Sequence, residues 1–167
     1  MAETSTDAID LLVYGPVKPV INSGFAAPFR THAIQNKHEL TRLTDDVAAR
    51  IRGIAVTGLV PTDGTVLARF PKVEMVASFG VGYDHVDSAY ARKHGIIVTH
   101  TPDVLTEEVA DTALGLLIAT LREFVRADRY LRSGQWETRG DYPLTRGSLR
   151  DRVVGIVGLG RIGKAVA

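Results

Sequence analysis

The sequence lacks cysteine, a long hydrophobic run and an excess of either charge. Without cysteine, disulfides, thiolate metal ligands and a cysteine nucleophile are excluded. The most apolar stretch, residues 109–121, contains Asp111 and two threonines and is shorter than the roughly 20 apolar residues that span a membrane, so we expect no membrane segment. Twenty lysines and arginines against nineteen aspartates and glutamates leave a formal charge of +1 without a basic block, which argues against a nucleic-acid partner.

The first residues also lack the features of a signal peptide, because residues 1–7 contain neither a basic stretch nor an apolar core. We therefore expect a cytoplasmic protein. His32, His38, His94 and His100 show no spacing that places two of them on one helix face, so we expect no metal site. Hydrophobic residues make up 45% of the 167 residues and charged residues 23%, a balance typical of globular proteins. This length predicts one domain, or one domain and part of another.

Short β-branched or apolar runs alternate with polar stretches of helical period over the first 100 residues. Such alternation predicts an α/β domain with a parallel sheet covered on both faces, because a parallel crossover needs a connection of that length. The strands are expected at residues 9–14, 31–34, 54–57, 73–78 and 96–99, and the helices at residues 39–52, 63–69 and 88–94.

A long helix is expected to begin at Thr106, whose hydroxyl would cap it ahead of Glu107 and Glu108 in the first turn. Its apolar residues continue to Val125 on a broad stripe, so we expect burial on more than one side. After a looser segment, residues 153–157 (VVGIV) have the composition of a sixth strand.

This sixth strand would run directly into residues 158–163 (GLGRIG) and a helix start. In a dinucleotide-binding turn, Gly158 would permit the tight turn, Gly160 would let a pyrophosphate approach the backbone, and Gly163 would let helix and strand pack closely. The alternative is a strand-to-helix turn without a ligand. The complete unit needs about 30 residues and a ribose-binding residue about 20 positions after the glycines, whereas only residues 164–167 follow. We therefore expect a fragment that lacks most of its cofactor site.

A second candidate site is the loop at residues 78–87 (SFGVGYDHVD), which follows an expected strand. Gly80 and Gly82 can turn consecutive backbone N–H groups inward as a site for a carboxylate. The alternative is a tight turn in which Asp87 caps the next helix, and the residues alone leave both interpretations open. His85 lies between two aspartates, but histidines near helix caps are common, so we do not expect it to be a catalytic base.

Four segments of the sequence occur in a characteristic order and spacing: residues 79–87 (FGVGYDHVD), 101–111 (TPDVLTEEVAD), 134–136 (GQW) and 157–163 (VGLGRIG). In these segments the sequence resembles the D-2-hydroxyacid dehydrogenases. Within that family, it is most similar to the hydroxypyruvate/glyoxylate and hydroxyphenylpyruvate reductase branch. The resemblance implies a flavodoxin-like substrate domain over residues 1–105, completed by the C-terminus of the parent protein, and the truncated beginning of a Rossmann NAD(P)-binding domain over residues 106–167.

The resemblance also implies the parts of the site. The family's catalytic arginine, glutamate and histidine would all lie beyond residue 167, so no catalytic residue is expected within the chain. Backbone N–H groups in the loop Gly80, Val81 and Gly82 would hold the substrate carboxylate. Thr106 would lie near the nicotinamide, and the pyrophosphate would contact Arg161 and Ile162 beside Gly158, Gly160 and Gly163.

The implied reaction of the intact parent is the reduction of a small 2-keto acid, such as glyoxylate or hydroxypyruvate, to the D-2-hydroxy acid. The fragment alone is expected to be inactive. Members of this branch commonly prefer NADPH, so NADP is favoured as the cofactor and NAD is the alternative. The long helix from Thr106 contributes to the dimer interface in relatives, which implies a homodimer. Because fold does not fix function, a non-catalytic alternative stays open: a dinucleotide-sensing protein like the dehydrogenase-related transcriptional corepressors.

Overall fold

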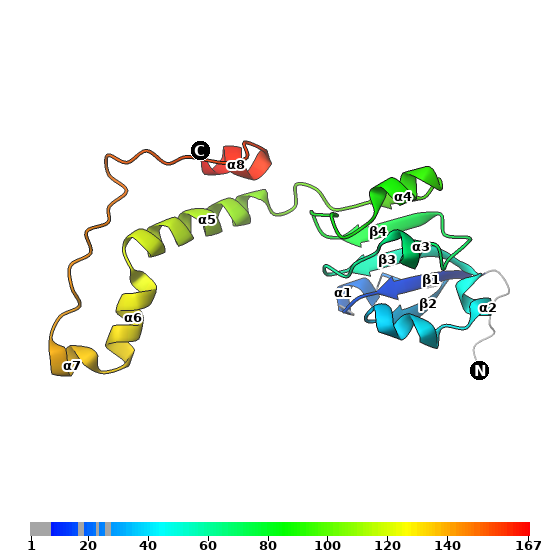
Figure 1. The fold of residues 1–167 in the computed structure, drawn as a ribbon, viewed down its shortest axis with the longest axis horizontal. Helices are drawn as coiled ribbons and strands as arrows, with labels where there is room; N and C mark the ends of the chain where they lie inside the picture. Colours follow the sequence, from blue (N-terminus) through cyan, green and yellow to red (C-terminus); the bar gives the residue numbers. More distant parts are fainter. Residues whose placement is uncertain (1–7, 17–18, 23, 26–27) are drawn as a thin grey trace. The chain divides into compact units, whose positions relative to one another are not determined.

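A computed structural model describes residues 8–16, 19–22, 24–25 and 28–167 of the chain (Figure 1). The chain divides into two compact units, Met1–Val104 (unit 1) and Leu105–Ala167 (unit 2). The first unit ends at Val104, one residue before the end of the first domain expected from the sequence. Among the described residues, no helix is both long and apolar enough to cross a membrane.

Unit 1 contains a five-stranded sheet in which every strand pair is parallel. The strand order is β2-β1-β3-β4-β5, which is the flavodoxin-like order of doubly wound α/β folds. The predicted fold class is therefore confirmed, and all five expected strands are present, the first with the expected ends and the other four with shifted ends. The strands are β1 (Ile9–Tyr14), β2 (Phe29–Ile34), β3 (Ile51–Thr57), β4 (Met75–Phe79) and β5 (Ile97–Thr99).

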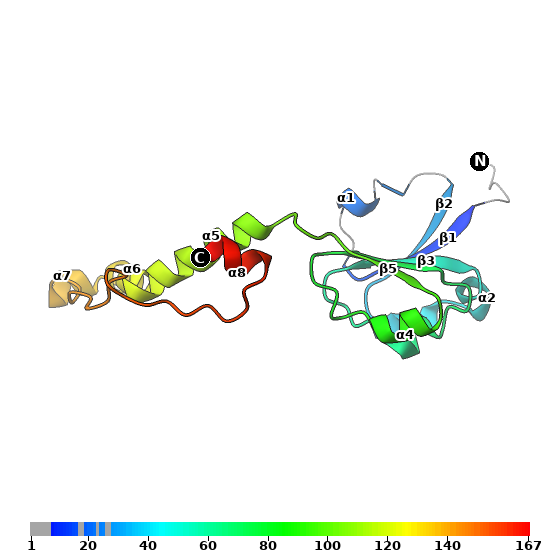
Figure 2. The ribbon, with the colours of Figure 1, turned by 90° about the horizontal axis from the view of Figure 1, so that it is seen from above.

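Short helices with polar N-caps connect these strands. The Asp63 carboxylate accepts hydrogen bonds from the N–H groups of Thr65 and Val66, and Asp87 accepts one from Tyr90. Figure 2 shows α1 on one face of the sheet and α2 and α4 on the other. The helices of unit 1 are α1 (Pro19–Asn22), the 3-10 helix η1 (Lys37–Arg42), α2 (Asp45–Ala48), α3 (Gly64–Leu67) and α4 (Ser88–Lys93).

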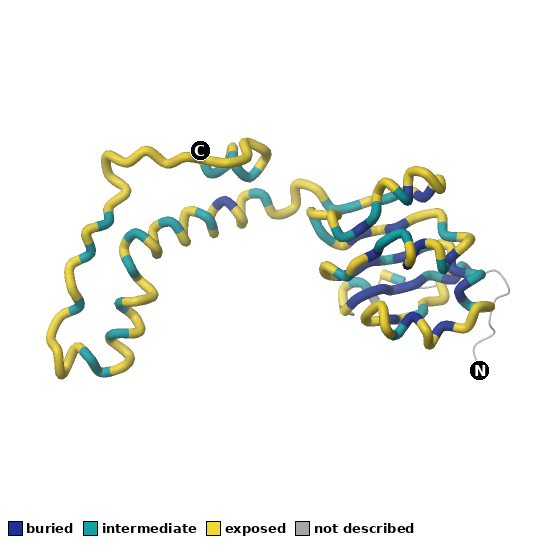
Figure 3. Tube along the Cα trace, in the orientation of Figure 1, coloured by how far each residue is buried: buried dark blue, intermediate teal, exposed yellow. Residues whose placement is uncertain are grey.

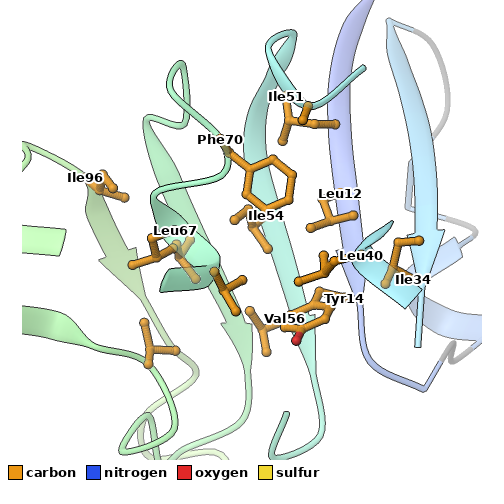
Figure 4. Close-up of a cluster of buried hydrophobic side chains, with 14 of the residues drawn as sticks. Leu12, Tyr14, Ile34, Leu40, Ile51, Ile54, Val56, Leu67, Phe70 and Ile96 are labelled. Atoms are coloured by element: carbon orange, nitrogen blue, oxygen red, sulfur yellow. The ribbon is translucent and has the colours of Figure 1, made fainter. Parts of the chain in front are cut away.

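The hydrophobic core lies between the sheet and the helices α2 to α4 (Figure 3). Alternate side chains of the strands point to this face, where Leu12, Tyr14, Ile54 and Val56 are at most 2% exposed (Figure 4). Phe70, which follows α3, is 1% exposed in the same cluster. Burial of each such side chain contributes about 1.5–3 kcal/mol, so this face holds the sheet and helices together.

The opposite face of the sheet remains open over β4 and β5. Its alternate residues include Met75, Phe79 and Ile97, which are 40%, 47% and 57% exposed. A parallel sheet is normally covered on both faces, and α1 covers only part of this one (Figure 2). The expectation of complete cover is therefore not met within the described residues.

The predicted helix over residues 39–52 is wrong. The segment contains η1, the short α2 and the first residues of β3 instead. Asn36 caps η1, and Thr44 then interrupts the segment by accepting a hydrogen bond from Val47 N–H as the cap of α2. Two polar caps thus divide an apolar pattern that by itself resembles one continuous helix.

Unit 2 is helical. The predicted long helix begins at Thr106 as expected, but Leu105 occupies the cap position without a side-chain hydrogen bond, so the predicted Thr106 cap is wrong. The helix also ends at Leu121 rather than continuing to Val125, because Glu123 adopts the left-handed conformation (φ 53°) and starts a new helix. The helices are α5 (Thr106–Leu121), α6 (Phe124–Arg132), α7 (Gln135–Arg139) and α8 (Arg161–Val166).

Two further expectations for unit 2 concern α5 and residues 153–157. Within α5 only Ala110 is buried, and Leu116 is 63% exposed, so the described residues of unit 2 do not themselves supply the expected burial on more than one side. Residues 153–157 do not form a strand, and Val153 and Val157 are almost fully exposed. A strand needs a neighbour to accept and donate its ladder hydrogen bonds, and unit 2 as described contains no strand beside this segment.

Candidate functional site

The loop after β4 is tied through its carbonyl groups to the end of β5. The Thr101 N–H donates to the Gly80 carbonyl at 2.9 Å, and His100 Nδ1 lies 2.8 Å from the Val81 carbonyl oxygen. Because a carbonyl oxygen can only accept, this bond assigns the proton to His100 Nδ1. Two successive carbonyl groups of the loop are thus paired with one short segment.

The N–H groups of the same loop remain available. Among the described residues, no hydrogen bond is donated by the N–H of Val81 or of Gly82. A Cβ added at Gly80 or Gly82 would meet its nearest atom at 3.7 Å, an ordinary contact, and neither glycine has a left-handed φ. The loop therefore presents free backbone donors at the carboxyl edge of the sheet, where open α/β sheets bind ligands.

The far end of the loop is anchored to the connection between β3 and α3. Thr62, which is fully buried, donates its N–H to the His85 carbonyl at 2.7 Å and accepts from the Asp87 N–H at 3.0 Å. Asp87 caps α4 by accepting from Tyr90 N–H at 2.8 Å, as the capped-turn interpretation predicted. The cap and the free donors occur together, so the two interpretations of this loop are compatible.

His85 is part of this anchor. Its Nε2 lies 3.3 Å from the hydroxyl of Ser78, which is 4% exposed, and in the described structure His85 makes no hydrogen bond to Asp84 or Asp87. Its Nδ1 is buried and has no hydrogen-bond partner among the described residues. In the described structure, His85 is therefore not oriented by a neighbouring carboxylate.

Two cavities flank this loop within unit 1. One, of about 320 Å³, is mostly apolar and lies against the ends of β3, β4 and β5; its lining includes Phe25, Ala55, Ser78, Phe79, His100 and Thr101. The other, of about 400 Å³, is lined by Tyr83, Ser88, Arg92, Ile96, Val98 and His100. His100 belongs to both linings. His100 therefore borders both cavities.

The three glycines of the glycine-rich turn in unit 2 differ in conformation and in surroundings. Gly158 has a left-handed φ of 94°, which permits the tight turn. A Cβ at Gly160 would meet nothing within 4 Å, which leaves the backbone open to a ligand, whereas a Cβ at Gly163 would lie 2.1 Å from the Gly158 carbonyl oxygen. These three features are compatible with a dinucleotide-binding turn.

Helix α8, which contains Arg161 and Ile162, lies beside the N-terminal half of α5 in both views (Figures 1 and 2). Thr106 is the first residue of α5 and is half-buried. The structure thus brings the Thr106 end of α5 and the glycine-rich turn to the same part of unit 2.

A carboxylate with three basic partners lies at the opposite edge of the sheet. Asp10, at the start of β1, is 4% exposed; His32 Nε2 lies 2.6 Å from it, with Arg30 at 3.5 Å and Arg50 at 3.6 Å. Burial alone would raise the pKa of Asp10, but the hydrogen bond to His32 and the charges of Arg30 and Arg50 outweigh it and lower the pKa. Because it is far from the carboxyl edge, we interpret this cluster as structural.

Sequence reasoning missed the contacts that His100 and Thr101 make with this loop. The available signal was positional, since residues 100 and 101 directly follow an expected strand at the same edge as Gly80. The apolar cavity beside Val20, Ile21, Gly24 and Phe25 had no sequence signal. Among the described residues, no cluster of three potential metal ligands occurs.

The fold and these two sites define an α/β protein with a glycine loop at the carboxyl edge of a flavodoxin-like sheet, followed by a glycine-rich turn on a helical unit. Residues 11–157 match the catalytic domain of the D-isomer specific 2-hydroxyacid dehydrogenases, and the chain belongs to that family. The resemblance stated from the sequence is thereby confirmed.

Several relatives are similar over much of the chain. A glyoxylate/hydroxypyruvate reductase of Arabidopsis thaliana is 37% identical over 161 residues, which are 96% of this chain and 51% of the relative. A hydroxyphenylpyruvate reductase of Plectranthus scutellarioides is 45% identical over 120 residues, covering 72% and 38%. The crystal structure of an NADPH-dependent glyoxylate/hydroxypyruvate reductase from Sinorhizobium meliloti, in complex with NADP and malonate, is 45% identical with a TM-score of 0.85 and covers 96% of this chain and 49% of its own. The chain thus spans about half the length of the last relative and of the Arabidopsis enzyme.

Proposed function

We propose that the full-length protein containing this chain reduces a small 2-keto acid, of the glyoxylate or hydroxypyruvate type, to the D-2-hydroxy acid with a nicotinamide cofactor. The observation that carries the proposal is the loop at residues 80–82, where the carbonyl groups of Gly80 and Val81 accept hydrogen bonds while the N–H groups of Val81 and Gly82 donate none among the described residues. Relatives named as reductases of these substrates support the same activity. Neither the fold nor these relatives favours the corepressor alternative.

The residues of this chain would act by binding and orientation. The N–H groups of Val81 and Gly82 would hold the substrate carboxylate and so fix the direction of the keto group. The nicotinamide, when bound, supplies the hydride. The proton donor and the groups that polarise the carbonyl would come from the family's arginine, glutamate and histidine in the remainder of the protein.

The cofactor is proposed to bind at the glycine-rich turn. Gly158, Gly160 and Gly163 fit a pyrophosphate because the turn is tight, open at its middle glycine and closely packed at its last. Arg161 and Ile162 would contact the pyrophosphate and Thr106 would lie near the nicotinamide. NADP is favoured over NAD, with support from the Sinorhizobium meliloti structure, which contains NADP.

We further propose that unit 1 is the substrate domain and is completed by a segment from the C-terminal part of the protein, and that unit 2 begins the Rossmann domain. The open sheet face at Met75, Phe79 and Ile97 supports the first part. The exposed apolar residues Leu116 and Phe124 of α5 and α6 support a homodimer. The mass of the full-length protein in solution, measured by light scattering, tests the dimer.

The function is tested by following the loss of reduced-nicotinamide absorbance with the full-length protein, NADPH or NADH, and a panel of 2-keto acids. Turnover of glyoxylate or hydroxypyruvate, with NADPH used more efficiently than NADH, is the expected result. If the folded protein turns over none of the panel with either cofactor, the enzyme proposal is wrong.

A further inference from the structure

His100 makes the side-chain contact that holds the proposed substrate loop. Its Nδ1–H donates to the Val81 carbonyl at 2.8 Å, and its ring lies against the Tyr83 ring with centroids 4.9 Å apart. His100 directly follows β5, so its backbone is fixed by the sheet. The tautomer is fixed as well, because the carbonyl oxygen can only accept.

Peptide planarity connects this bond to a donor on the other side of the chain. In a trans peptide, the carbonyl of one residue and the N–H of the next lie in one plane and point in opposite directions. The carbonyl of Val81 shares its peptide with the N–H of Gly82, and the carbonyl of Gly80 shares its peptide with the N–H of Val81. Holding each carbonyl therefore fixes the direction of the N–H group that follows it.

The two peptides are held in different ways. The Gly80 carbonyl accepts from a backbone group, the N–H of Thr101, which no side-chain substitution removes. The Val81 carbonyl accepts from a side chain. A hydrogen bond to a carbonyl also polarises its peptide and strengthens the opposite N–H as a donor. The aim and strength of the Gly82 N–H thus depend on the identity of residue 100.

We propose that His100 is a positioning residue for substrate binding, which directs the Gly82 N–H at the substrate carboxylate through the Val81 peptide. The inference rests on the proposed function, because it assigns a role within that binding site. It names a side chain outside the loop as a determinant of affinity for 2-keto acids. The competing explanation is that His100 only fills space between the two cavities.

Three substitutions in the full-length protein separate these explanations. His100→Phe keeps a ring beside Tyr83 but removes the donor. His100→Asn keeps an N–H donor close to the position of Nδ1, whereas His100→Gln moves the donor one bond further out. The matched control is His94→Phe, because His94 Nδ1 also lies 2.8 Å from a carbonyl oxygen, that of Tyr90, and its ring stacks on Tyr90 at 3.9 Å.

For His100→Phe we expect a rise of about tenfold in KM for glyoxylate, the size expected for the loss of one hydrogen bond. The value of kcat should stay within about twofold, because the carboxylate is bound equally in the ground and transition states. The dissociation constant of NADPH should not change. His100→Asn should recover most of the affinity and His100→Gln should not, while His94→Phe should leave KM at the wild-type value.

Hydrogen exchange of the loop gives a readout that does not depend on turnover. In His100→Phe, the amides of residues 80–83 should exchange faster than in the wild type, and malonate should slow them less. The inference is overturned if His100→Phe keeps the wild-type KM and the wild-type amide exchange rates of residues 80–83. It is also overturned if His100→Asn and His100→Gln raise KM equally. A wild-type protein without turnover would refute the proposed function, whereas an active wild type with an unaffected His100→Phe would refute only this inference.

Discussion

Single glycines in the two candidate sites have different physical roles although their sequence patterns look alike. In the glycine-rich turn, Gly163 is required by packing, since any Cβ there would collide with the Gly158 carbonyl. Gly160 is free of such contacts, so only a ligand would require it to be glycine. In the loop after β4, Gly82 also lacks a structural requirement. Substitutions at these glycines therefore separate folding from binding.

The first prediction concerns the cofactor turn. Gly160→Val in the full-length protein should leave the melting temperature nearly unchanged but weaken NADPH binding by about a hundredfold or more, because the side chain occupies the approach of the pyrophosphate. Gly163→Ala should instead lower the free energy of unfolding by about 1–3 kcal/mol through overpacking. Calorimetric titration and thermal melts measure both. Unchanged NADPH affinity in a folded Gly160→Val protein would mean that the turn has no ligand.

The second prediction concerns the substrate loop. Gly82→Ala should raise KM for the keto acid about tenfold with the free energy of unfolding changed by no more than about 0.5 kcal/mol, because the new Cβ makes only a 3.7 Å contact with Asp84 but crowds the donors. NADPH affinity should stay at the wild-type value.

Gly95→Ala is the matched control for this change. Gly95 has a φ of 71° and open space around it, so alanine should cost about 1 kcal/mol of stability through backbone strain without affecting KM. If Gly82→Ala lowers stability as Gly95→Ala does and leaves KM unchanged, the loop after β4 is only a turn.

At the scale of elements, the sequence predicts the strands and helices that an apolar run or a capping residue marks locally. The strands of unit 1 are apolar runs, and α3 and α4 start at Asp63 and Asp87, whose carboxylates cap them. The helix expected over residues 39–52 failed because its caps, Asn36 and Thr44, were overlooked. Hydrophobic periodicity alone predicts one helix here, whereas the polar caps divide the segment into η1, α2 and the start of β3.

Other elements depend on contacts that no local pattern contains. The break between α5 and α6 lies inside a continuous apolar stripe, where Tyr142 OH donates to the Glu123 carboxylate at 2.6 Å from a segment 19 residues away. Residues 153–157 have strand composition, but pairing requires a partner. In the candidate sites, the glycines were visible in the sequence, whereas His100 was not, because its bond to Val81 exists only once β4 and β5 pair.

The third prediction belongs to the edge where β1, β2 and β3 begin. Asp10→Asn should lower the free energy of unfolding at pH 7 by about 1–3 kcal/mol, because it removes the charge that pairs with His32, Arg30 and Arg50. Since the pKa of Asp10 is lowered in the folded state, this contribution is present above about pH 4 and is lost as the pH falls below the ordinary pKa of aspartate.

Urea unfolding at a series of pH values measures this difference. The gap between wild type and Asp10→Asn should be constant near neutral pH and should narrow as the pH falls below about 4. Glu74→Gln is the control, because Glu74 pairs with Arg52 on the surface and should contribute less. A gap that does not depend on pH would show that the ionised carboxylate of Asp10 is not the source of the stability.

At the scale of the whole molecule, the open sheet face gives the fourth prediction. If a further segment of the full-length protein covers β4 and β5, Ile97→Asp should lower its free energy of unfolding by several kcal/mol, at least about 3, by burying an unpaired charge. Ala89→Asp, at an exposed position of α4, should change it by about 0.5 kcal/mol or less. Equal, small effects in a denaturant titration would show that this face is exposed to water.

The unpaired segment at residues 153–157 has a consequence for the chain in isolation. It is a short, uncharged, β-branched stretch without proline, and its backbone groups have no ladder partner within unit 2. Such a segment is a template on which identical segments from other molecules can add as strands. Arg152 supplies the adjacent charge that opposes this stacking. Removing that charge while residues 153–157 are unpaired would favour self-association, so Arg152 protects the isolated chain against aggregation through this segment.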